Sequence, residues 1–463
     1  MREFDCVVVG AGPGGYVAAI RAAQLGAKTA IIERNKIGGT CLNWGCIPTK
    51  ALYYSAKTLD KARHAADFGV NVGEVSFDLA KAVERKDGVV KKLVGGVEQL
   101  LKGNKVEVIR GNAYLESAGK IRVSNGDATE EIAGKSVIIA TGSEPALIPA
   151  FNIDRVNVLT STEMLDLKKV PESLLVIGGG VMGCEFATMF ATFGSSVMIV
   201  ELLPTILSTE DKMVARVIAK RFKETGVSVL TEVQVESVTP EGGRVKTRLK
   251  DGREFITDKV MVAIGRSFNS AGIGLDRLGV TMDRGRIAVD ERMETNVKGV
   301  FAIGDVTGKM LLAHVASTQG IVAANNAAGK DARMDYSIIP AGIFTDPEIA
   351  SVGLREKDAE EKGIPVSVGR FPYAASGKAL GMGETEGFVQ LVADPGTDKV
   401  LGCSIVGAHA TDLIGEVAIA MKAGATVKDI ADTVHAHPTL PEIVMEAAED
   451  VHGMAIHKIG RKK

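Results

Sequence analysis

The chain has 463 residues and a formal net charge of −2, and 46% of its residues are hydrophobic and 24% charged. This near-neutral balance excludes a strong field that would recruit nucleic acid or an anionic membrane. No apolar run reaches the ~18 residues of a membrane span, and the length predicts about three domains rather than one core.

The cysteine content and the first residues predict a reducing, cytoplasmic compartment. Five cysteines, an odd number, occur in a long chain that begins MREFDCVVVGAG. This beginning runs straight into a predicted strand and leaves no room for a signal peptide, so we expect a disulfide here to be catalytic rather than structural. The last four residues, 460–463, are expected to form a solvated tail.

The first predicted elements form a βαβ unit, with a buried parallel strand over residues 6–9, a helix over 16–25 and a strand over 28–32 that ends at Glu33. Three glycines in GxGxxG spacing join the first strand to the helix: Gly10, Gly12 and Gly15. Such glycines let backbone amides approach a pyrophosphate, and the acid can hold ribose hydroxyls. We interpret the unit as a dinucleotide site, the alternative being a glycine-rich turn of an ordinary α/β fold.

The next motif, GGTCLNWGCIPTK at residues 38–50, brings Cys41 and Cys46 close together in the sequence. Two positions five apart in a regular helix are separated by ~7.5 Å along its axis and lie on nearly opposite faces. A disulfide needs Cα atoms within about 6.8 Å, so bridging them requires a local distortion. Gly45 can supply that distortion, and the stretch is typical of a site where two sulfurs meet.

Three interpretations of this cysteine pair stay open at this point: a redox pair, half of a zinc site, and two unrelated thiols. Closing so short a loop would remove only ~2 kcal/mol of unfolded-chain entropy, which favours redox use over a structural staple. The other cysteines lie far away in the sequence and supply no CxxC pair to complete a zinc site: Cys6, Cys184 and Cys403.

The nucleotide motif then repeats, with a predicted strand over residues 174–177, a helix, and a second strand ending in Glu201. Its glycines are Gly178, Gly180 and Gly183, and Gly178 lies 168 residues after Gly10. Two dinucleotide sites in one chain suggest electron transfer between the two nucleotides. A duplicated unit with one inactive copy is the alternative, although neither copy has lost a glycine or its acid.

Three later strand ends suggest that the second unit is inserted into the first domain. Residues 137–145 (VIIATGSEP) and 260–268 (VMVAIGRSF) each end a strand series in a glycine turn. Residues 299–306 (GVFAIGDV) end another strand in Asp305, which could bind a sugar-like chain. Because this third strand follows the second nucleotide unit, we expect the chain to return to the first domain there.

Taken with HAHPTLPE at residues 435–442, these motifs resemble those of the FAD-dependent pyridine nucleotide–disulfide oxidoreductases, in family order over essentially the whole chain. The resemblance implies an α/β fold with two Rossmann-like dinucleotide-binding domains, the second inserted in the first, and a C-terminal α+β dimerisation domain. The expected domains are 1–149 (FAD-binding, first part), 150–268 (NAD-binding), 269–338 (return to the FAD or central domain) and 339–463 (interface).

Within the family, the pattern is similar to that of members that oxidise protein-bound dihydrolipoamide through a redox-active disulfide and FAD and pass a hydride to NAD. The implied partners are a second copy of the chain and the lipoyl domains of an acyltransferase or of the glycine cleavage H protein, with no nucleic acid, membrane or metal. Alternatives are a glutathione or mercuric reductase, a transhydrogenase, and a structural flavoprotein with idle catalysis. The tail MAIHKIGRKK has no cysteine pair for mercury.

The resemblance also assigns roles to single residues. Cys41 would be the sulfur that exchanges with substrate and Cys46 the sulfur against the flavin, with Lys50 one helical turn later paired to Glu185. His437 would be the acid–base group.

Glu442 would orient His437, and His435 is the neighbouring histidine that the family does not use. Pro441 replaces the usual serine and removes an amide donor, which could tilt Glu442 and leaves its orienting role open at this point.

The remaining implied contacts are to the two cofactors. The FAD contacts are Gly10, Gly12, Gly15, Glu33, Lys50, Ala113, Thr141, Gly142, Ser143, Asp305, Leu311, Leu312, Ala313 and His314. The NAD contacts are Gly178, Gly180, Gly183, Glu185, Glu201 and Gly265. The segment LLPTIL after Glu201 offers no arginine for a 2′-phosphate, which predicts NAD rather than NADP.

Overall fold

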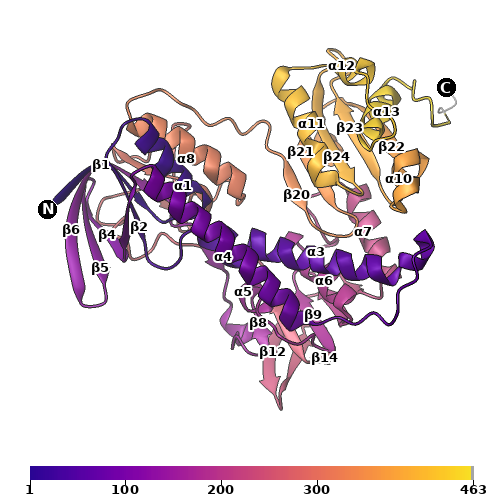
Figure 1. The fold of residues 1–463 in the computed structure, drawn as a ribbon, viewed down its shortest axis with the longest axis horizontal. Coiled ribbons are helices and arrows are strands. Elements are labelled where there is room, and N and C mark those ends of the chain that lie inside the picture. Colours follow the sequence, from indigo (N-terminus) through magenta and orange to yellow (C-terminus); the bar gives the residue numbers. More distant parts are fainter. Residues whose placement is uncertain (460–463) are drawn as a thin grey trace.

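The computed structural model describes residues 1–459, and the predicted solvated tail at 460–463 lies outside the described residues. Figure 1 shows three bodies: one built from the indigo N-terminal strands and the orange α8, one in magenta and pink, and one in yellow at the C-terminal end. Within residues 1–459, no helix combines the length and apolar character needed to cross a membrane.

The first body is built on a parallel sheet in the order β3-β2-β1-β6, with β19 added beside β6. The bounds are β1 Arg2–Val9, β2 Thr29–Glu33, β3 Glu107–Arg110, β6 Ala128–Ile139 and β19 Val300–Ala302. The first half of β6 also continues an antiparallel meander with β4 (Asn112–Ser117) and β5 (Lys120–Asn125). Both faces of β1 are covered, which explains its continuous apolar run.

Two helices from distant parts of the sequence lie side by side on one face of this sheet: α1 (Pro13–Gln24) and α8 (Ala313–Ala327) (Figure 1). Their backbones approach closely, because a Cβ on Gly320 would lie 2.5 Å from the carbonyl oxygen of Gly14. Helix α1 begins three residues before its predicted start, since proline is favoured in the first turn, where its missing N–H costs nothing.

The second body repeats the parallel arrangement in the order β11-β10-β9-β15-β8. Its strands are β8 Val158–Leu159, β9 Ser173–Ile177, β10 Ser196–Val200, β11 Ser228–Leu230 and β15 Lys259–Val262. Its helices are α5 Ser161–Met164, α6 Val181–Phe193 and α7 Lys212–Glu224, and its antiparallel meander consists of β12 Val235–Glu241, β13 Arg244–Leu249 and β14 Glu254–Thr257. It is therefore a second Rossmann-like unit.

A short antiparallel ribbon marks where the chain leaves the first body and where it returns. Strand β7 (Ser143–Pro145) precedes the second unit, strand β16 (Arg266–Phe268) follows it, and the two pair with each other. The hairpin of β17 (Met282–Asp283) and β18 (Arg286–Ile287) then leads to β19 in the first sheet. This return confirms that the second Rossmann-like unit is inserted in the first.

The third body is an antiparallel sheet in the order β20-β21-β24-β23-β22. Its strands are β20 Ala341–Ile343, β21 Ile349–Gly353, β22 Ser367–Pro372, β23 Phe388–Ala393 and β24 Val400–Val406. Its helices are α9 Glu356–Lys362, α10 Gly377–Met382, α11 Ala410–Ala423, α12 Val427–Asp432 and α13 Pro441–Val451. With this α+β body, the predicted fold class is confirmed as a whole.

Two long helices connect the three bodies: α3 (Cys46–Arg63) and α4 (Leu79–Gly103) (Figure 1). Helix α4 reaches the second body through the buried Lys86, whose Nζ donates to the carbonyl of Leu165 at 3.1 Å. Helix α3 reaches the third body through Tyr53, whose hydroxyl donates to the carbonyl of Thr345 at 3.1 Å. Cys46 is thus the first residue of a helix that touches every domain.

Candidate active site

A break between two helices positions the cysteine pair. Helix α2 (Gly39–Trp44) carries Cys41, and α3 begins with Cys46. Gly45 lies between them at φ −135° and ψ −115°, which places the predicted distortion at this glycine. A Cβ there would lie 2.9 Å from the carbonyl oxygen of Thr40, so the turn closes tightly only with glycine.

The two cysteines are free thiols that act on each other, and their environments separate their acidities. The Cys41 thiol lowers the pKa of Cys46 to about 7, with help from the Lys50 ammonium and against the effect of burial. The Cys46 sulfur, together with burial, raises the pKa of Cys41 well above its usual range. Cys46 is therefore the sulfur that ionises first.

The predicted Lys50–Glu185 pair is present. Lys50 Nζ lies 3.0 Å and 2.9 Å from the two carboxylate oxygens of Glu185, whose side chain is only 6% exposed. Phe344, directly after β20, donates its backbone N–H to Glu185 Oε1 at 2.9 Å and places its ring centroid 4.4 Å from Lys50 Nζ. Sequence reasoning missed Phe344, because along the chain it is an ordinary apolar residue at a strand end.

The first glycine motif forms a cradle at the N-terminus of α1. A Cβ on Gly15 would lie 1.9 Å from the carbonyl oxygen of Gly10, whereas one on Gly12 would meet nothing closer than 4.0 Å. The cradle is therefore closely packed between Gly10 and Gly15 and has open space beside Gly12. Glu33 closes it by accepting the backbone N–H of Ala11 (2.8 Å) and of Asn35 (2.7 Å).

The second cradle, at the N-terminus of α6, repeats this geometry. A Cβ on Gly183 would lie 1.9 Å from the carbonyl oxygen of Gly178, and one on Gly180 would meet nothing within 4 Å. Glu201 accepts the backbone N–H of Gly179 (2.6 Å) and of Leu203 (2.7 Å). The predicted Gly265 has φ +133° and open space beside it.

The predicted Thr141, Gly142, Ser143 and Asp305 gather where the two bodies join. Ser143 Oγ donates to Asp305, and Gly142 adopts φ +69°. Arg266 of β16, which sequence reasoning missed, donates to Ser143 Oγ at 2.6 Å. The buried Thr141 hydroxyl has no hydrogen-bond partner within residues 1–459, as expected of a group that serves a ligand.

The other predicted FAD contacts lie on the same body. Ala113 is buried in β4, two residues after Gly111, whose N–H donates to the carbonyl of Glu33 at 3.1 Å. Leu311 and Leu312 precede α8, and Ala313 and His314 form its first turn. The Nε2 atom of His314 already has a partner within the chain, because it lies 2.8 Å from the carbonyl oxygen of Pro340.

The histidine pair of HAHPTLPE separates into one buried and one exposed ring. His435 is 7% exposed and contacts Glu416 of α11 through Nε2 at 2.8 Å. His437 is 78% exposed, and its Nδ1 lies 2.9 Å from Glu442 Oε1.

Pro441 does not remove the contact between Glu442 and His437. Pro441 is the first residue of α13, where the missing N–H would have no partner in any case. Glu442 keeps its contact with His437 and also accepts the backbone N–H of Thr439 at 2.7 Å.

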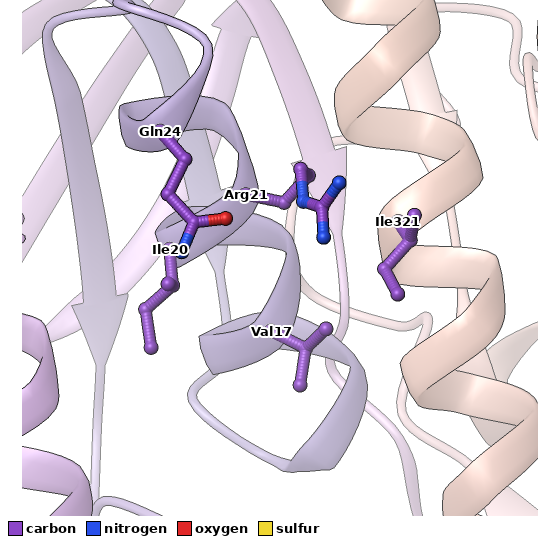
Figure 2. A pocket seen from close by; sticks show the side chains of 5 residues that line it. All are labelled: Val17, Ile20, Arg21, Gln24 and Ile321. Carbon is purple, nitrogen blue, oxygen red and sulfur yellow. The ribbon is translucent and has the colours of Figure 1, made fainter.

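The structure does not bring every predicted residue together. Within residues 1–459, no hydrogen bond or ion pair joins His437 to Cys41 or Cys46. A shallow hollow between α1 and α8 is equally separate, because its lining contains none of the predicted site residues (Figure 2). The hollow is lined by Val17, Ile20, Arg21, Gln24 and Ile321.

These observations fit two dinucleotides. Each cradle is open beside its second glycine, and each ends in a carboxylate that has lone pairs left for ribose hydroxyls after accepting two N–H groups. The first site also has the unpartnered Thr141 hydroxyl and lies on the same body as the thiols. The residues present therefore fit FAD in the first cradle and NAD in the second.

Comparison with known proteins agrees with this geometry. The family model described as pyridine nucleotide-disulphide oxidoreductase matches residues 4–320, and the model of its dimerisation domain matches residues 339–448. The chain is 46% identical to a dihydrolipoyl dehydrogenase from Geobacillus stearothermophilus, covering 99% of this chain and 98% of that protein. It is 44% identical to one from Staphylococcus aureus, covering 98% of each.

Solved structures show the same architecture. LpdA from Mycobacterium tuberculosis superposes with a TM-score of 0.91 at 29% identity, covering 97% of this chain and 99% of that one. The HOCl-induced flavoprotein disulfide reductase RclA from Escherichia coli gives 0.87 at 29% identity, with the same coverage. The chain therefore belongs to the pyridine nucleotide-disulphide oxidoreductase family, in its dihydrolipoyl dehydrogenase branch, whose cofactors are FAD and NAD.

Proposed function

We propose that the chain oxidises protein-bound dihydrolipoamide to lipoamide by thiol–disulfide exchange at Cys41 and Cys46, with NAD as the final electron acceptor. The observation that carries the proposal is the meeting of these two thiols at the break between α2 and α3, beside the Lys50–Glu185 pair. FAD, when bound, supplies the two-electron link between the dithiol and NAD.

The sulfur chemistry balances within the chain and its substrate. One substrate thiolate attacks Cys41 of the enzyme disulfide, forming a mixed disulfide and releasing Cys46 as a thiolate. The second substrate thiolate attacks its own neighbouring sulfur in the mixed disulfide, closing the lipoamide ring and releasing Cys41. The substrate loses two electrons and two protons, and the enzyme gains a dithiol.

The ionisation order of the two sulfurs suits this sequence. Cys46 is the leaving group of the first exchange, and thiols whose thiolates are stabilised, and whose pKa is therefore lower, leave faster. The Lys50 ammonium stabilises the resulting thiolate, while Glu185 holds that ammonium in place.

His437 is the proposed acid–base group for the substrate thiols. Its Nδ1–H donates to Glu442, which leaves Nε2 free to take a proton. The dimerisation domain indicates a homodimer. Because His437 is exposed and not joined to its own chain's thiols, we propose that it serves the Cys41–Cys46 pair of the partner subunit.

The proposed partners beyond the dimer are lipoyl domains, such as those of 2-oxo acid dehydrogenase acyltransferases or the glycine cleavage H protein. These carriers share the dithiol that the exchange chemistry requires, which makes the lipoyl group itself the recognised element.

The decisive experiment is a turnover assay of the purified, FAD-loaded protein. We expect NADH formation from NAD with dihydrolipoamide, and a much lower rate of NADH- or NADPH-dependent reduction of oxidised glutathione. A glutathione reductase rate above the dihydrolipoamide rate would replace the proposal with its nearest alternative.

A further inference from the structure

Phe344 of the interface domain contacts both members of an ion pair that the other two domains form. Lys50 comes from α3 and Glu185 from α6. The backbone N–H of Phe344 donates to Glu185 Oε1 at 2.9 Å, and its ring centroid lies 4.4 Å from Lys50 Nζ. The carboxylate and the aromatic ring thus both restrain the Lys50 ammonium.

The ring of Phe344 is itself held in place. It meets the ring of the buried Tyr53 edge-on, with centroids 5.7 Å apart and planes at 80°. The Tyr53 hydroxyl donates to the carbonyl of Thr345, the residue after Phe344. Helix α3 begins with Cys46 and carries both Tyr53 and Lys50. Through Tyr53, this helix holds the loop that contains Phe344, and the ring of Phe344 faces Lys50.

The position of the Lys50 charge matters because of what surrounds the Cys46 sulfur. The titratable groups that act on it are Cys41 on α2, Lys50 on α3, Glu185 on α6 and Arg266 on β16. The ammonium favours the thiolate and the carboxylate opposes it. A lysine held between Glu185 and an aromatic face keeps its charge near the sulfur, whereas a lysine free to rotate on its four-carbon stem would spend time in solvent.

We propose that Phe344 is a positioning residue of the redox site: its aromatic face and its backbone N–H hold the Lys50–Glu185 pair so that the ammonium faces Cys46. This inference rests on the proposed function, in which Cys46 is the sulfur that becomes a thiolate. It also means that docking of the interface domain contributes to the electrostatics of the thiols.

The test compares Phe344→Leu with Phe344→Tyr in FAD-loaded protein that also carries Cys41→Ser, so that Cys46 alone of the pair ionises. The rate of Cys46 alkylation by iodoacetamide, followed by peptide mass spectrometry across pH, gives the midpoint of thiolate formation. Tyrosine keeps the aromatic face, and we expect the midpoint found with phenylalanine. Leucine loses that face, and we expect the midpoint to rise by about 0.5–1 pH unit.

Tyr53→Phe in the same background is the matched control. It removes the hydroxyl that holds Thr345 but keeps both the Tyr53 ring that packs against Phe344 and the Phe344 face over Lys50, so we expect a smaller rise of the midpoint than in Phe344→Leu. An unchanged midpoint in Phe344→Leu, or an equal rise in Tyr53→Phe, would overturn the proposal. If Phe344→Leu fails to retain FAD, Phe344→Met takes its place with the same expected rise. Midpoints need no turnover, so failure of the dihydrolipoamide assay in the unmodified chain remains a separate result.

Discussion

Glu33 and Glu201 occupy equivalent positions in the two nucleotide-binding units, and each carboxylate accepts two backbone N–H bonds. These bonds orient each carboxylate before any ligand arrives, so that little reorganisation is needed to receive ribose hydroxyls. In the second unit, the same fixed negative charge opposes a 2′-phosphate, which gives a physical reason to expect NAD rather than NADP.

Replacing Glu201 with alanine and Leu202 with arginine should narrow the preference for NAD over NADP by about 10- to 100-fold. The change removes a repelling charge and adds an attracting one, and Leu202 is exposed enough (61%) to carry an arginine. The measurement is kcat/KM with each nucleotide at subsaturating concentration. Glu201→Gln is the control that keeps an acceptor for Gly179 and loses the charge together with the acceptor for Leu203. Equal rates with both nucleotides in the unmodified enzyme would contradict the prediction.

The five cysteines should divide sharply into two groups. Serine at Cys41 or Cys46 should abolish dihydrolipoamide turnover while FAD stays bound, because the exchange needs both sulfurs. Serine at Cys6, Cys184 or Cys403 should affect mainly stability, since all three are buried and burial raises the pKa of Cys6 to about 12. Turnover and the flavin spectrum of each purified variant provide the check, and an active Cys41→Ser or Cys46→Ser enzyme would contradict the redox role.

At the scale of elements, the functional feature is the junction of α2 and α3. Two short-range requirements meet there: α2 must end at Trp44, and α3 must begin at Cys46. Gly45 satisfies both because its missing Cβ leaves room for the carbonyl of Thr40. An unbroken helix would point the two sulfurs away from each other.

Gly45→Ala should therefore slow thiol–disulfide exchange without removing FAD. The added Cβ would lie 2.9 Å from the Thr40 oxygen, so the junction must open and separate the sulfurs. Gly88→Ala in α4 is the matched control, because it adds a methyl group to an exposed helix position with nothing within 4 Å. We expect the control to keep full turnover and gain about 0.5–1 kcal/mol of unfolding free energy, measured in urea. Equal turnover in the two variants would show that the break is not required.

At the scale of the whole molecule, the three bodies are tied together by charged side chains near the active site. Asp346, in the loop after Phe344, bonds Lys57 of α3 at 2.7 Å and Arg221 of α7 at 3.2 Å. Burial tends to raise the pKa of Asp346, but the two cations outweigh it and hold the pKa below its ordinary value. One carboxylate thus links the interface domain to both of the others.

Asp346→Asn should lower the free energy of unfolding at pH 7 by about 1.5–3 kcal/mol, because two cations lose their charged partner. An acid whose folded pKa is depressed stabilises the fold above its unfolded pKa of about 3.9 and loses that contribution as pH falls through the folded value. The difference in unfolding free energy between the unmodified protein and Asp346→Asn should therefore shrink below about pH 4. Urea unfolding of both proteins at pH 7 and below about pH 4 measures this difference in free energy. A difference that grew as the pH fell would contradict the lowered pKa of Asp346.

Mixed dimers test the proposed sharing of the active site. Cys41→Ser and His437→Gln subunits should each be inactive as homodimers, the histidine change costing about 10²–10⁴-fold. In a hybrid, one site combines both defects and the other combines an intact Cys41 with an intact His437. Hybrids purified with two different tags should recover roughly half of wild-type activity per dimer. A hybrid that stays inactive with FAD fully bound would show that His437 serves its own subunit.

Much of the fold and site could be predicted because their requirements are local. Gly10 and Gly178 at φ +101° and +107°, and the close approaches at Gly15 and Gly183, are backbone demands that only glycine meets, so they are visible as spacing. The Cys41–Gly45–Cys46 arrangement is local in the same sense. The predicted start of the first helix, at residue 16, misses its first turn, because Pro13 is accepted at a helix start, where its missing N–H has no partner in any case.

By itself, the sequence determined the two nucleotide cradles and the cysteine junction, because each depends on residues of one βαβ unit or one helix junction. Tertiary structure alone decided that Phe344 meets Glu185 across 159 positions, that Arg266 meets Ser143 across 123, and that Asp346 receives Lys57 across 289. A phenylalanine, an arginine or an aspartate acquires such a role only from the charges that folding brings to it. These contacts lie where the three bodies meet, and no periodicity along the chain encodes that meeting.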